Sequence, residues 1–299
     1  MRVLVSGSHG LIGSALVARL ATSGHDVVRL TRGPRTQPQT VSWDPAEGRL
    51  DPQQLVGVDA VVHLAGEGIG DHRWTSAHLG RVLDSRVQGT TLLAQALSTL
   101  ERRPAVLLSA SAIGYYGDCG DEAVTESHGP GQGFLAEVCQ QWEAATASAE
   151  AAGIRVAHLR TGVVLSPTGG ALGKQLPLFR LGLGGRLGAG DQYLSWIDLD
   201  DAAGAIEFAL GATDLHGPVN VTAPAPVTNA EFTKALGKAL HRPAFLAVPE
   251  AALRLVMGRQ MANEMVLSGA RVLPTRLEAA GYRFLRPTLV ESLTHIAGR

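Results

Sequence analysis

The feature that most constrains this chain is a glycine triplet directly after a short apolar run near its N-terminal end. Residues 2–6 read Arg-Val-Leu-Val-Ser, and Gly7-xx-Gly10-xx-Gly13 follows at once. Residues 11–22 then place apolar side chains at helical spacing. In such a strand-turn-helix, glycine permits a tight turn, a close approach of a ligand to the backbone, and close packing of helix against strand. The pattern predicts a turn that binds phosphate groups at a helix N-terminus.

Strand-like and helix-like segments alternate along the first half of the chain. Continuous apolar strands separated by helices are typical of a parallel sheet with both faces covered. We therefore predict an α/β fold with a doubly wound parallel sheet of the Rossmann type, whose ligands bind at the carboxyl ends of the strands. The expected strands are 2–6, 26–31, 59–64, 105–109 and 155–159, and the expected helices are 11–22, 76–99 and 134–152.

The composition changes near residue 167, where glycine-rich loops and shorter elements begin. We expect a core domain over residues 1–166, to which residues 195–221 return, and a smaller, mainly helical region over 167–299. The expected elements of the C-terminal part are helices at 232–240, 251–257, 264–270 and 289–296, and strands at 219–221 and 245–248.

Composition excludes several classes of protein. The 299 residues are 45% hydrophobic and 18% charged, and the formal net charge is −1. These values argue against intrinsic disorder and against a broad basic face for nucleic acid. Cys119 and Cys139 are too few for a disulfide framework, and no spacing suits a metal. With no long apolar run and a start that enters the first strand at once, we expect a cytoplasmic protein without signal peptide or membrane partner.

The end of the second expected strand indicates which dinucleotide the turn would take. An NAD enzyme usually carries Asp or Glu there to hold the ribose hydroxyls. Here the strand ends Leu30-Thr31-Arg32-Gly33-Pro34-Arg35, with no acid. Arg32 and Arg35 are placed to hold a 2′-phosphate. The sequence therefore favours NADP as the cofactor.

Further motifs give the chain a family resemblance. It resembles the extended short-chain dehydrogenase/reductase superfamily over residues 1–210, and more narrowly its atypical branch of nucleoside-diphosphate-sugar epimerase-like proteins. Members of that branch carry a C-terminal extension, matched here by residues 254–293. Besides the glycine triplet, the motifs that carry the resemblance are His63-Leu64-Ala65-Gly66, Ser109-Ala110-Ser111-Ala112-Ile113-Gly114-Tyr115-Tyr116-Gly117-Asp118, Leu159-Arg160-Thr161-Gly162 and Trp196-Ile197-Asp198-Leu199-Asp200-Asp201.

The resemblance implies a cofactor site. In that branch the positions of Thr31-Arg32, Leu64-Ala65, Arg86 and Arg160 contact NADP. Because clefts in open α/β sheets lie beyond the strand ends, we expect the region from about residue 223 onward to cover the nicotinamide half of the cleft or to be a stabilising appendage, and residues 7–35 to hold the adenine half. With the glycine turn included, the expected cofactor-binding residues are Gly7, Gly10, Leu11, Ile12, Gly13, Thr31, Arg32, Leu64, Ala65, Glu67, Arg86 and Arg160.

The usual catalytic pair of this superfamily is missing. Ordinary members carry Tyr-xxx-Lys on the helix after the serine strand, where the lysine lowers the tyrosine pKa and the phenolate moves a proton. Phe134 and Val138 stand at those positions, and the first lysine of the chain is Lys174. The hydroxyl groups that could substitute are those of Ser111, Tyr115 and Tyr116.

Other polar residues allow more than one interpretation. Glu67 could act as an acid or base or anchor the cofactor or its own loop, and His63 suits the core. Lys174, in a loop expected to be glycine-rich, could contact substrate or remain solvated. Gln192, Trp196 and Asp198 could shape a pocket wall or pack at a strand end.

Two functional classes remain open. One is an NADP-dependent oxidoreductase or epimerase that acts on a small molecule of unspecified class. The other is a non-catalytic NADP(H)-binding protein that senses redox state and regulates a partner. No GxSxG or phosphate-loop motif supports a hydrolase. No pattern specifies an oligomeric state.

Overall fold

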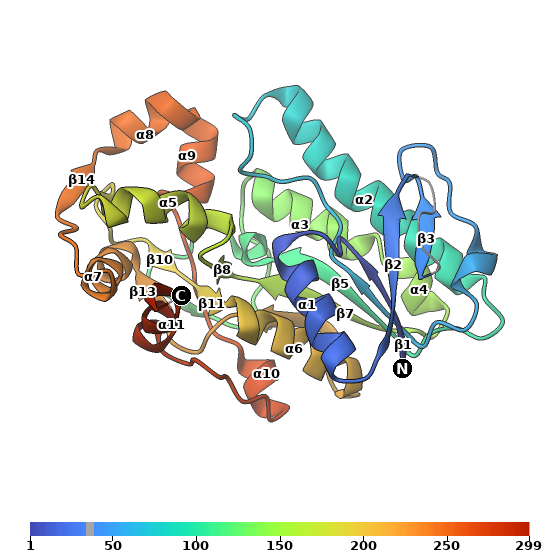
Figure 1. Cartoon of the computed structure of the whole chain (residues 1–299). Helices are drawn as coiled ribbons and strands as arrows, with labels where there is room; N and C mark the ends of the chain where they lie inside the picture. Colours follow the sequence, from blue (N-terminus) through green and yellow to red (C-terminus); the bar gives the residue numbers. More distant parts are fainter. Residues whose placement is uncertain (34–38, 299) are drawn as a thin grey trace. The chain divides into compact units, whose positions relative to one another are not determined.

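The computed structural model describes residues 1–33 and 39–298 (Figure 1). The chain forms two compact units, each assembled from three segments: 1–111, 138–160 and 203–219 in the first, and 112–137, 161–202 and 220–299 in the second. The strands are β1 (Arg2–Ser6), β2 (Asp26–Arg32), β3 (Thr40–Trp43), β4 (Ala60–His63), β5 (Val106–Ala112), β6 (Ala123–Val124), β7 (Arg155–Thr161), β8 (Val163–Leu165), β9 (Gly185–Leu187), β10 (Tyr193–Leu194), β11 (Trp196–Asp198), β12 (Gly217–Val221), β13 (Val227–Thr228), β14 (Leu246–Val248) and β15 (Arg271–Val272).

The described residues also form α-helices and short 3₁₀ helices. They are α1 (Leu11–Thr22), α2 (Ser76–Ser98), α3 (Phe134–Ala144), α4 (Ala147–Ala151), α5 (Gly170–Arg180), α6 (Leu199–Gly211), α7 (Asn229–Ala239), α8 (Glu250–Met257), α9 (Arg259–Met265), α10 (Thr275–Ala279) and α11 (Leu289–Ala297), with short 3₁₀ helices at Pro52–Leu55 and Ile113–Tyr116. No helix of the described residues is both long and apolar enough to cross a membrane.

The first unit is built on a seven-stranded sheet with the order β12-β7-β5-β4-β1-β2-β3. Strand β1 pairs in parallel with β2 on one side and with β4 on the other. The chain therefore reverses its direction of travel across the sheet between β1 and β4, which is the topological switch point where doubly wound folds bind their ligands. The predicted doubly wound parallel sheet is confirmed.

Burial explains the packing of helices on this sheet. Leu4 of β1 and Leu107 of β5 belong to one apolar cluster with Leu93 and Leu97 of α2. Because side chains alternate along a strand, Val3 and Val5 point to the opposite face, where α1 lies (Figure 1). Both faces of the sheet are therefore covered, as the continuous apolar strands predict.

The second unit has its own core and small two-stranded sheets. Its main apolar cluster joins three helices, α5, α7 and α11, around the fully buried Trp196 of β11. Lys174 lies on α5 and is exposed, so the loop expected around it is wrong. The helix expected at 264–270 is also wrong, because α9 ends at Met265 and the backbone at Gly269 packs against Tyr193 too closely for a Cβ atom.

Buried carboxylates hold the C-terminal segment to the rest of the second unit. Asp201 accepts hydrogen bonds from the backbone N–H groups of Leu285 (2.6 Å) and Arg286 (2.9 Å), and burial raises the pKa of Asp201. Asp198 accepts from the Arg286 guanidinium (2.9 Å) and the Ser292 hydroxyl (2.7 Å). The Asp198 carboxylate thus anchors the segment near residue 286.

The glycine turn generates a stability prediction. A Cβ atom on Gly13 of α1 would lie 2.1 Å from the Gly7 carbonyl oxygen, whereas a Cβ atom on Gly80 of α2 would meet open space. We expect Gly13→Ala to destabilise the protein by roughly 1–3 kcal/mol through overpacking. Gly80→Ala, the matched control, should stabilise it by up to about 1 kcal/mol because alanine favours helix. Urea unfolding measures both, and equal stabilities would contradict the prediction.

Candidate functional site

The glycine turn lies between β1 and α1, at the switch point of the sheet. Gly7 has a positive φ of 64°, and a Cβ atom there would lie 2.7 Å from the Leu64 backbone. The Gly10 N–H donates to the Gly7 carbonyl (2.9 Å), and Gly10 caps α1 without a side chain. The first backbone N–H groups of a helix have no partner within it, so those of Leu11, Ile12 and Gly13 are available to an anion.

A buried hydroxyl in this turn lacks a partner. The Ser8 side chain is 1% exposed, and its Oγ makes no hydrogen bond. Arg29 of β2 donates to the Ser8 carbonyl (3.1 Å), which ties the turn to the neighbouring strand. Because buried polar atoms in folded proteins are nearly always paired, an orphan hydroxyl beside free N–H groups indicates a site for a ligand with acceptor oxygens.

Ser6 and His63 fix the strand ends beside the turn. The Ser6 hydroxyl accepts from the Leu64 (3.0 Å) and Ala65 (3.2 Å) N–H groups and lies 2.7 Å from His63 Nδ1. With two donors already aimed at its oxygen, Ser6 donates its own proton to Nδ1, so His63 Nε2 donates to Thr90 (3.1 Å). His63 is therefore a neutral core histidine, and burial lowers its pKa to about 4.

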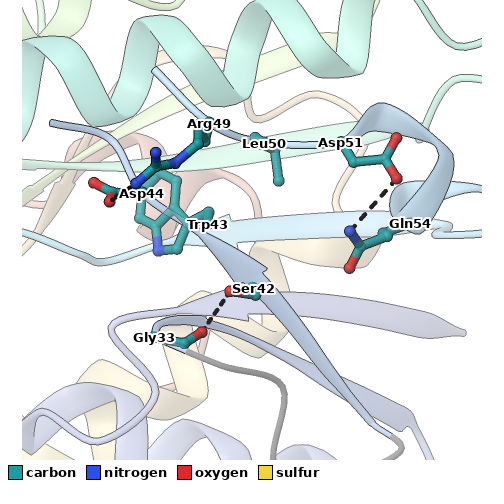
Figure 2. Close-up of a pocket in the computed structure, with 8 residues that line it drawn as sticks. All are labelled: Gly33, Ser42, Trp43, Asp44, Arg49, Leu50, Asp51 and Gln54. Atoms are coloured by element: carbon teal, nitrogen blue, oxygen red, sulfur yellow. Dashed lines mark hydrogen bonds and ion pairs between the residues drawn. The ribbon is translucent and has the colours of Figure 1, made fainter. Parts of the chain in front are cut away.

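The end of β2 carries no acid among the described residues. Arg32 is exposed there, Thr31 is half-buried, and the Ser42 hydroxyl of β3 donates to the Gly33 carbonyl. A pocket of about 400 Å³ adjoins this end, with an Arg49–Asp44 ion pair (2.9 Å) on its wall (Figure 2). Its lining residues are Gly33, Ser42, Trp43, Asp44, Arg49, Leu50, Asp51 and Gln54. Arg35, the second arginine expected at a 2′-phosphate, lies outside the described residues.

Glu67 follows β4 and is held ionised. Its carboxylate accepts from Arg81 (3.0 Å) and lies 3.4 Å from His78, and the Arg81 hydrogen bond lowers the pKa of Glu67. A lowered pKa makes this group a poor proton donor. The Arg86 guanidinium donates to the Glu67 carbonyl (3.0 Å) and lies 4.9 Å from the Trp142 ring centroid. Burial lowers the pKa of Arg86, yet a guanidinium stays charged.

Ser111 and Arg160 both donate hydrogen bonds to the carboxylate of Glu143, whose side chain is 12% exposed. Glu143 of α3 accepts from the Ser111 hydroxyl (2.7 Å) and from two nitrogens of Arg160 (2.8 and 2.9 Å). His158, whose pKa is lowered by burial, lies 4.0 Å from the same carboxylate and 2.9 Å from Thr146. Thr146 also donates to the Glu143 carbonyl, where the helix expected over 134–152 breaks into α3 and α4. Nothing in the sequence pattern had singled out Glu143.

Tyr116 is part of a buried network in the second unit. Its side chain is 2% exposed and its hydroxyl donates to Asn220 Oδ1 (2.7 Å). Asn220 in turn donates to the Leu273 carbonyl (2.9 Å) and, through its backbone, to the buried Glu126 (3.0 Å). Tyr115 is only half-buried and packs edge-on against the Tyr116 ring, with centroids 5.4 Å apart. The phenol of Tyr116 is thus committed to a structural bond.

The first turn of α3 begins with the apolar residue Phe134, and its N-terminus is capped by the carboxylate of Glu264, which belongs to α9. Phe134 is half-buried and Val138 is buried, so neither offers a proton at these positions. Glu264 of α9 accepts from the Leu135 N–H (3.0 Å), and Gly133, at φ 100°, leaves room for it. Glu264 thus caps a helix whose preceding residue has no side chain to do so.

The remaining residues expected at a pocket wall are engaged in the second unit. Gln192 donates to the Leu187 (3.1 Å) and Val266 (2.8 Å) carbonyls. The Trp196 side chain is fully buried, and its indole N–H donates to the Ala225 carbonyl (2.9 Å). In the described part of the chain, no group of three or more His, Cys, Asp or Glu side chains could hold a metal ion.

Comparison with known proteins identifies the family. Residues 3–221 match the NAD dependent epimerase/dehydratase family, and residues 248–296 match a domain of unknown function, DUF1731. The chain belongs to the epimerase/dehydratase family. The resemblance read from the glycine turn and the strand-end motifs is confirmed, together with the C-terminal extension.

Two similar proteins span the whole chain. An epimerase family protein of Mycobacterium bovis, Mb2239, is 46% identical over 297 residues, covering 99% of this chain and 98% of its own. The crystal structure of human epimerase family protein SDR39U1 with NADPH is 38% identical, covers 100% of this chain and 99% of its own, and superposes with a TM-score of 0.90. A more distant relative, MoeE5 in complex with UDP-glucose and NAD, shares the fold at 21% identity and a TM-score of 0.77, and covers 100% of this chain and 98% of its own.

The Glu143 carboxylate generates a stability prediction. Its removal would deprive the Arg160 guanidinium, whose side chain is 4% exposed, of the carboxylate to which two of its nitrogens donate. We expect Glu143→Ala to destabilise the protein by roughly 3–5 kcal/mol in urea unfolding. Asp44→Ala breaks the exposed pair with Arg49 and should change the free energy of unfolding far less. A Glu143→Ala variant as stable as Asp44→Ala would show that Arg160 finds another partner.

His63 generates a pH prediction. Because its folded pKa of about 4 lies below the ordinary 6.5, the unfolded chain binds more protons between these values. This contribution to stability is full above pH 6.5 and is lost as the pH falls toward 4, at up to about 1.4 kcal/mol per pH unit. Unfolding between pH 4 and 7 should show a shallower dependence of stability on pH for His63→Gln than for the wild type. Parallel curves for wild type and His63→Gln would contradict the assignment.

Proposed function

We propose that this protein binds NADP(H) in the first unit through the glycine turn. One observation carries the proposal: a turn where Gly7 and Gly13 leave no space for Cβ atoms holds the buried, unpartnered Ser8 hydroxyl beside the N-terminus of α1. Backbone N–H groups there suit the pyrophosphate oxygens. The NADPH in the human SDR39U1 structure supports the same cofactor class.

Each remaining cofactor residue has a proposed role. Arg32 and Thr31, at the end of β2, would hold the 2′-phosphate of NADPH. No acidic side chain at this strand end would repel that phosphate. The Leu64 and Ala65 backbone, fixed by Ser6, would line the ribose side. Arg86 would contribute fixed positive charge, and Glu67 would hold its own loop through Arg81. We propose that Arg160 contributes to the cofactor site indirectly, by holding the Glu143 carboxylate in place through two hydrogen bonds.

We further propose that the protein is an atypical oxidoreductase or epimerase acting on a small molecule. Bound NADP(H) supplies a hydride donor or acceptor. Since Phe134 and Val138 cannot move a proton, we propose that a hydroxyl does so. Tyr115 is our first candidate, because it is half-buried whereas Tyr116 is 2% exposed. Ser111 donates to Glu143, so its oxygen would accept a hydrogen bond from a substrate hydroxyl.

The hydrogen bonds made by the Ser111 and Tyr116 hydroxyls also favour a second function. Ser111 and Tyr116 both donate to internal acceptors, and the usual Tyr-xxx-Lys pair is absent. These features support a non-catalytic NADP(H)-binding protein that reports redox state to a partner. In either case we propose a cytoplasmic location and no nucleic-acid partner, because the net charge of −1 provides no broad basic face.

Deuterium transfer separates the two functions. The protein is incubated with NADPH deuterated on one face of C4 and an extract of small metabolites, and the products are read by mass spectrometry. An enzyme should transfer the label from one face only. Tyr115→Phe should lower the rate roughly 10²–10⁴-fold, as expected for a positioned proton donor, while NADPH affinity stays unchanged. Label that remains on NADPH at all protein concentrations would favour the regulatory function.

Arg32 sets the expected cofactor preference. Charge-assisted hydrogen bonds to a 2′-phosphate contribute roughly 1.5–3 kcal/mol, which corresponds to about tenfold to hundredfold tighter binding of NADPH than of NADH. Nicotinamide fluorescence titration should show this preference, and Arg32→Ala should abolish it. As a control, Arg19→Ala removes an arginine that is paired with Glu207, and this variant should keep the preference for NADPH. Equal affinities of the wild-type protein for both cofactors would overturn the NADP assignment.

A further inference from the structure

Exposed apolar side chains gather at the end of α5 and along β14 in the second unit. Figure 1 shows where these two elements lie. Phe245 is 80% exposed and Leu181 is 72% exposed, values that are unusual for large apolar side chains. We call this region the α5–β14 surface. It comprises the apolar residues Leu178, Leu181, Leu183, Phe245 and Leu246 and the exposed arginines Arg180, Arg186 and Arg242.

These residues form one continuous surface. Strand β14 pairs with β9, with Leu246 opposite Gly185 and Ala247 opposite Arg186. Arg242 Nε donates to the Arg180 carbonyl (2.9 Å), and a Cβ atom on Gly182 would lie 3.2 Å from Pro243. Two segments about sixty residues apart in sequence are therefore held side by side, and their apolar and basic side chains share one surface.

The charge on these segments has a single sign. Residues 170–190 and 232–249 contain six Lys or Arg and no Asp or Glu, whereas the whole chain has 26 basic and 27 acidic residues. Asp191, Glu231 and Glu250 adjoin these segments in sequence; Glu250 is paired with Arg254 at 2.9 Å, and Glu231 accepts hydrogen bonds from Thr228 at the start of α7. This local excess of positive charge, mixed with exposed apolar side chains, is complementary to a surface that is both anionic and apolar.

We propose that the α5–β14 surface docks the protein onto an anionic lipid bilayer. Phe245, Leu181 and Leu183 would enter the boundary between headgroups and acyl chains, and the arginines would contact the lipid phosphates. Such peripheral contact needs no membrane-crossing helix, so it is compatible with the helix lengths described above. It modifies the expectation that the protein has no membrane partner, and it does not depend on the proposed function.

The same observations disfavour other occupants. A symmetric contact with a second copy would place Arg180, Arg186 and Arg242 against an identical set, which is repulsive. Phe245 and Leu181 are 80% and 72% exposed, so both side chains are available for insertion. A fluid bilayer accommodates protruding side chains without a shaped counterpart.

Vesicle sedimentation tests the proposal with the full chain. We expect binding to vesicles of equal parts phosphatidylcholine and phosphatidylglycerol, weak binding to phosphatidylcholine alone, and loss of binding in high salt. Arg180→Ala with Arg242→Ala should weaken binding roughly twentyfold, at about fivefold for each charge. Phe245→Ser and Leu181→Ser should each weaken it roughly tenfold.

Controls separate the surface from general effects. Val290→Ser removes an apolar side chain that is 66% exposed on α11, and Arg49→Ala removes an exposed arginine of the first unit. Both should bind vesicles as the wild type does, and thermal unfolding confirms that every variant is folded. No binding to anionic vesicles, equal binding to both vesicle types, or surface variants that bind normally would overturn the proposal. So would a dimer in light scattering that Phe245→Ser dissolves, which would assign the surface to a second copy.

Discussion

The close contact between Gly7, Gly13 and the backbone after β4 is the constraint on which the rest of the first unit depends. A Cβ atom on Gly13 would lie 2.1 Å from the Gly7 carbonyl, and one on Gly7 would lie 2.7 Å from Leu64. This contact sets how near α1 and β4 come to the end of β1. It leaves the helix N–H groups and the Ser8 hydroxyl together at the switch point, where a phosphate ligand would be bound.

Carboxylates, in contrast, organise the positions where this superfamily usually performs chemistry. Glu143 binds Ser111 and Arg160 in the first unit, Glu126 supports the strand that carries Asn220, and Glu264 caps α3 beside Phe134. Each joins segments that lie far apart in the chain, or caps a helix from outside. Around the positions where Phe134 and Val138 replace the usual pair, charge-assisted hydrogen bonds to carboxylates therefore join distant segments.

Much of the fold could be predicted from the sequence because its signals are local. The strands at 2–6 and 26–31 and the helix at 11–22 agree with β1, β2 and α1 to within one residue, since apolar runs and glycine boundaries specify them. The helices α5 and α6 were missed; in α5, glycine and an internal proline weaken the helical signal.

The site was less predictable for a physical reason. Glycine spacing reveals a turn, but a partner such as Glu143, Asn220 or Glu264 depends on contacts over 32 to 129 positions in sequence. No local pattern distinguishes these residues from ordinary surface polar groups. The roles of Ser111, Tyr115 and Tyr116 stay predictions, although the structure shows that Ser111 donates to Glu143 and Tyr116 to Asn220.

The Asp198 and Asp201 carboxylates have a consequence for any shortened form of this chain. They lie in the part of the chain that matches the epimerase family, yet their partners Arg286 and Ser292 lie in DUF1731. A chain shortened before residue 248 would lose the Arg286 and Ser292 donors to Asp198 and the Leu285 and Arg286 N–H donors to Asp201, and both acids would then have to be hydrated. Deletion of the extension alone is therefore expected to lower the stability of the part that remains.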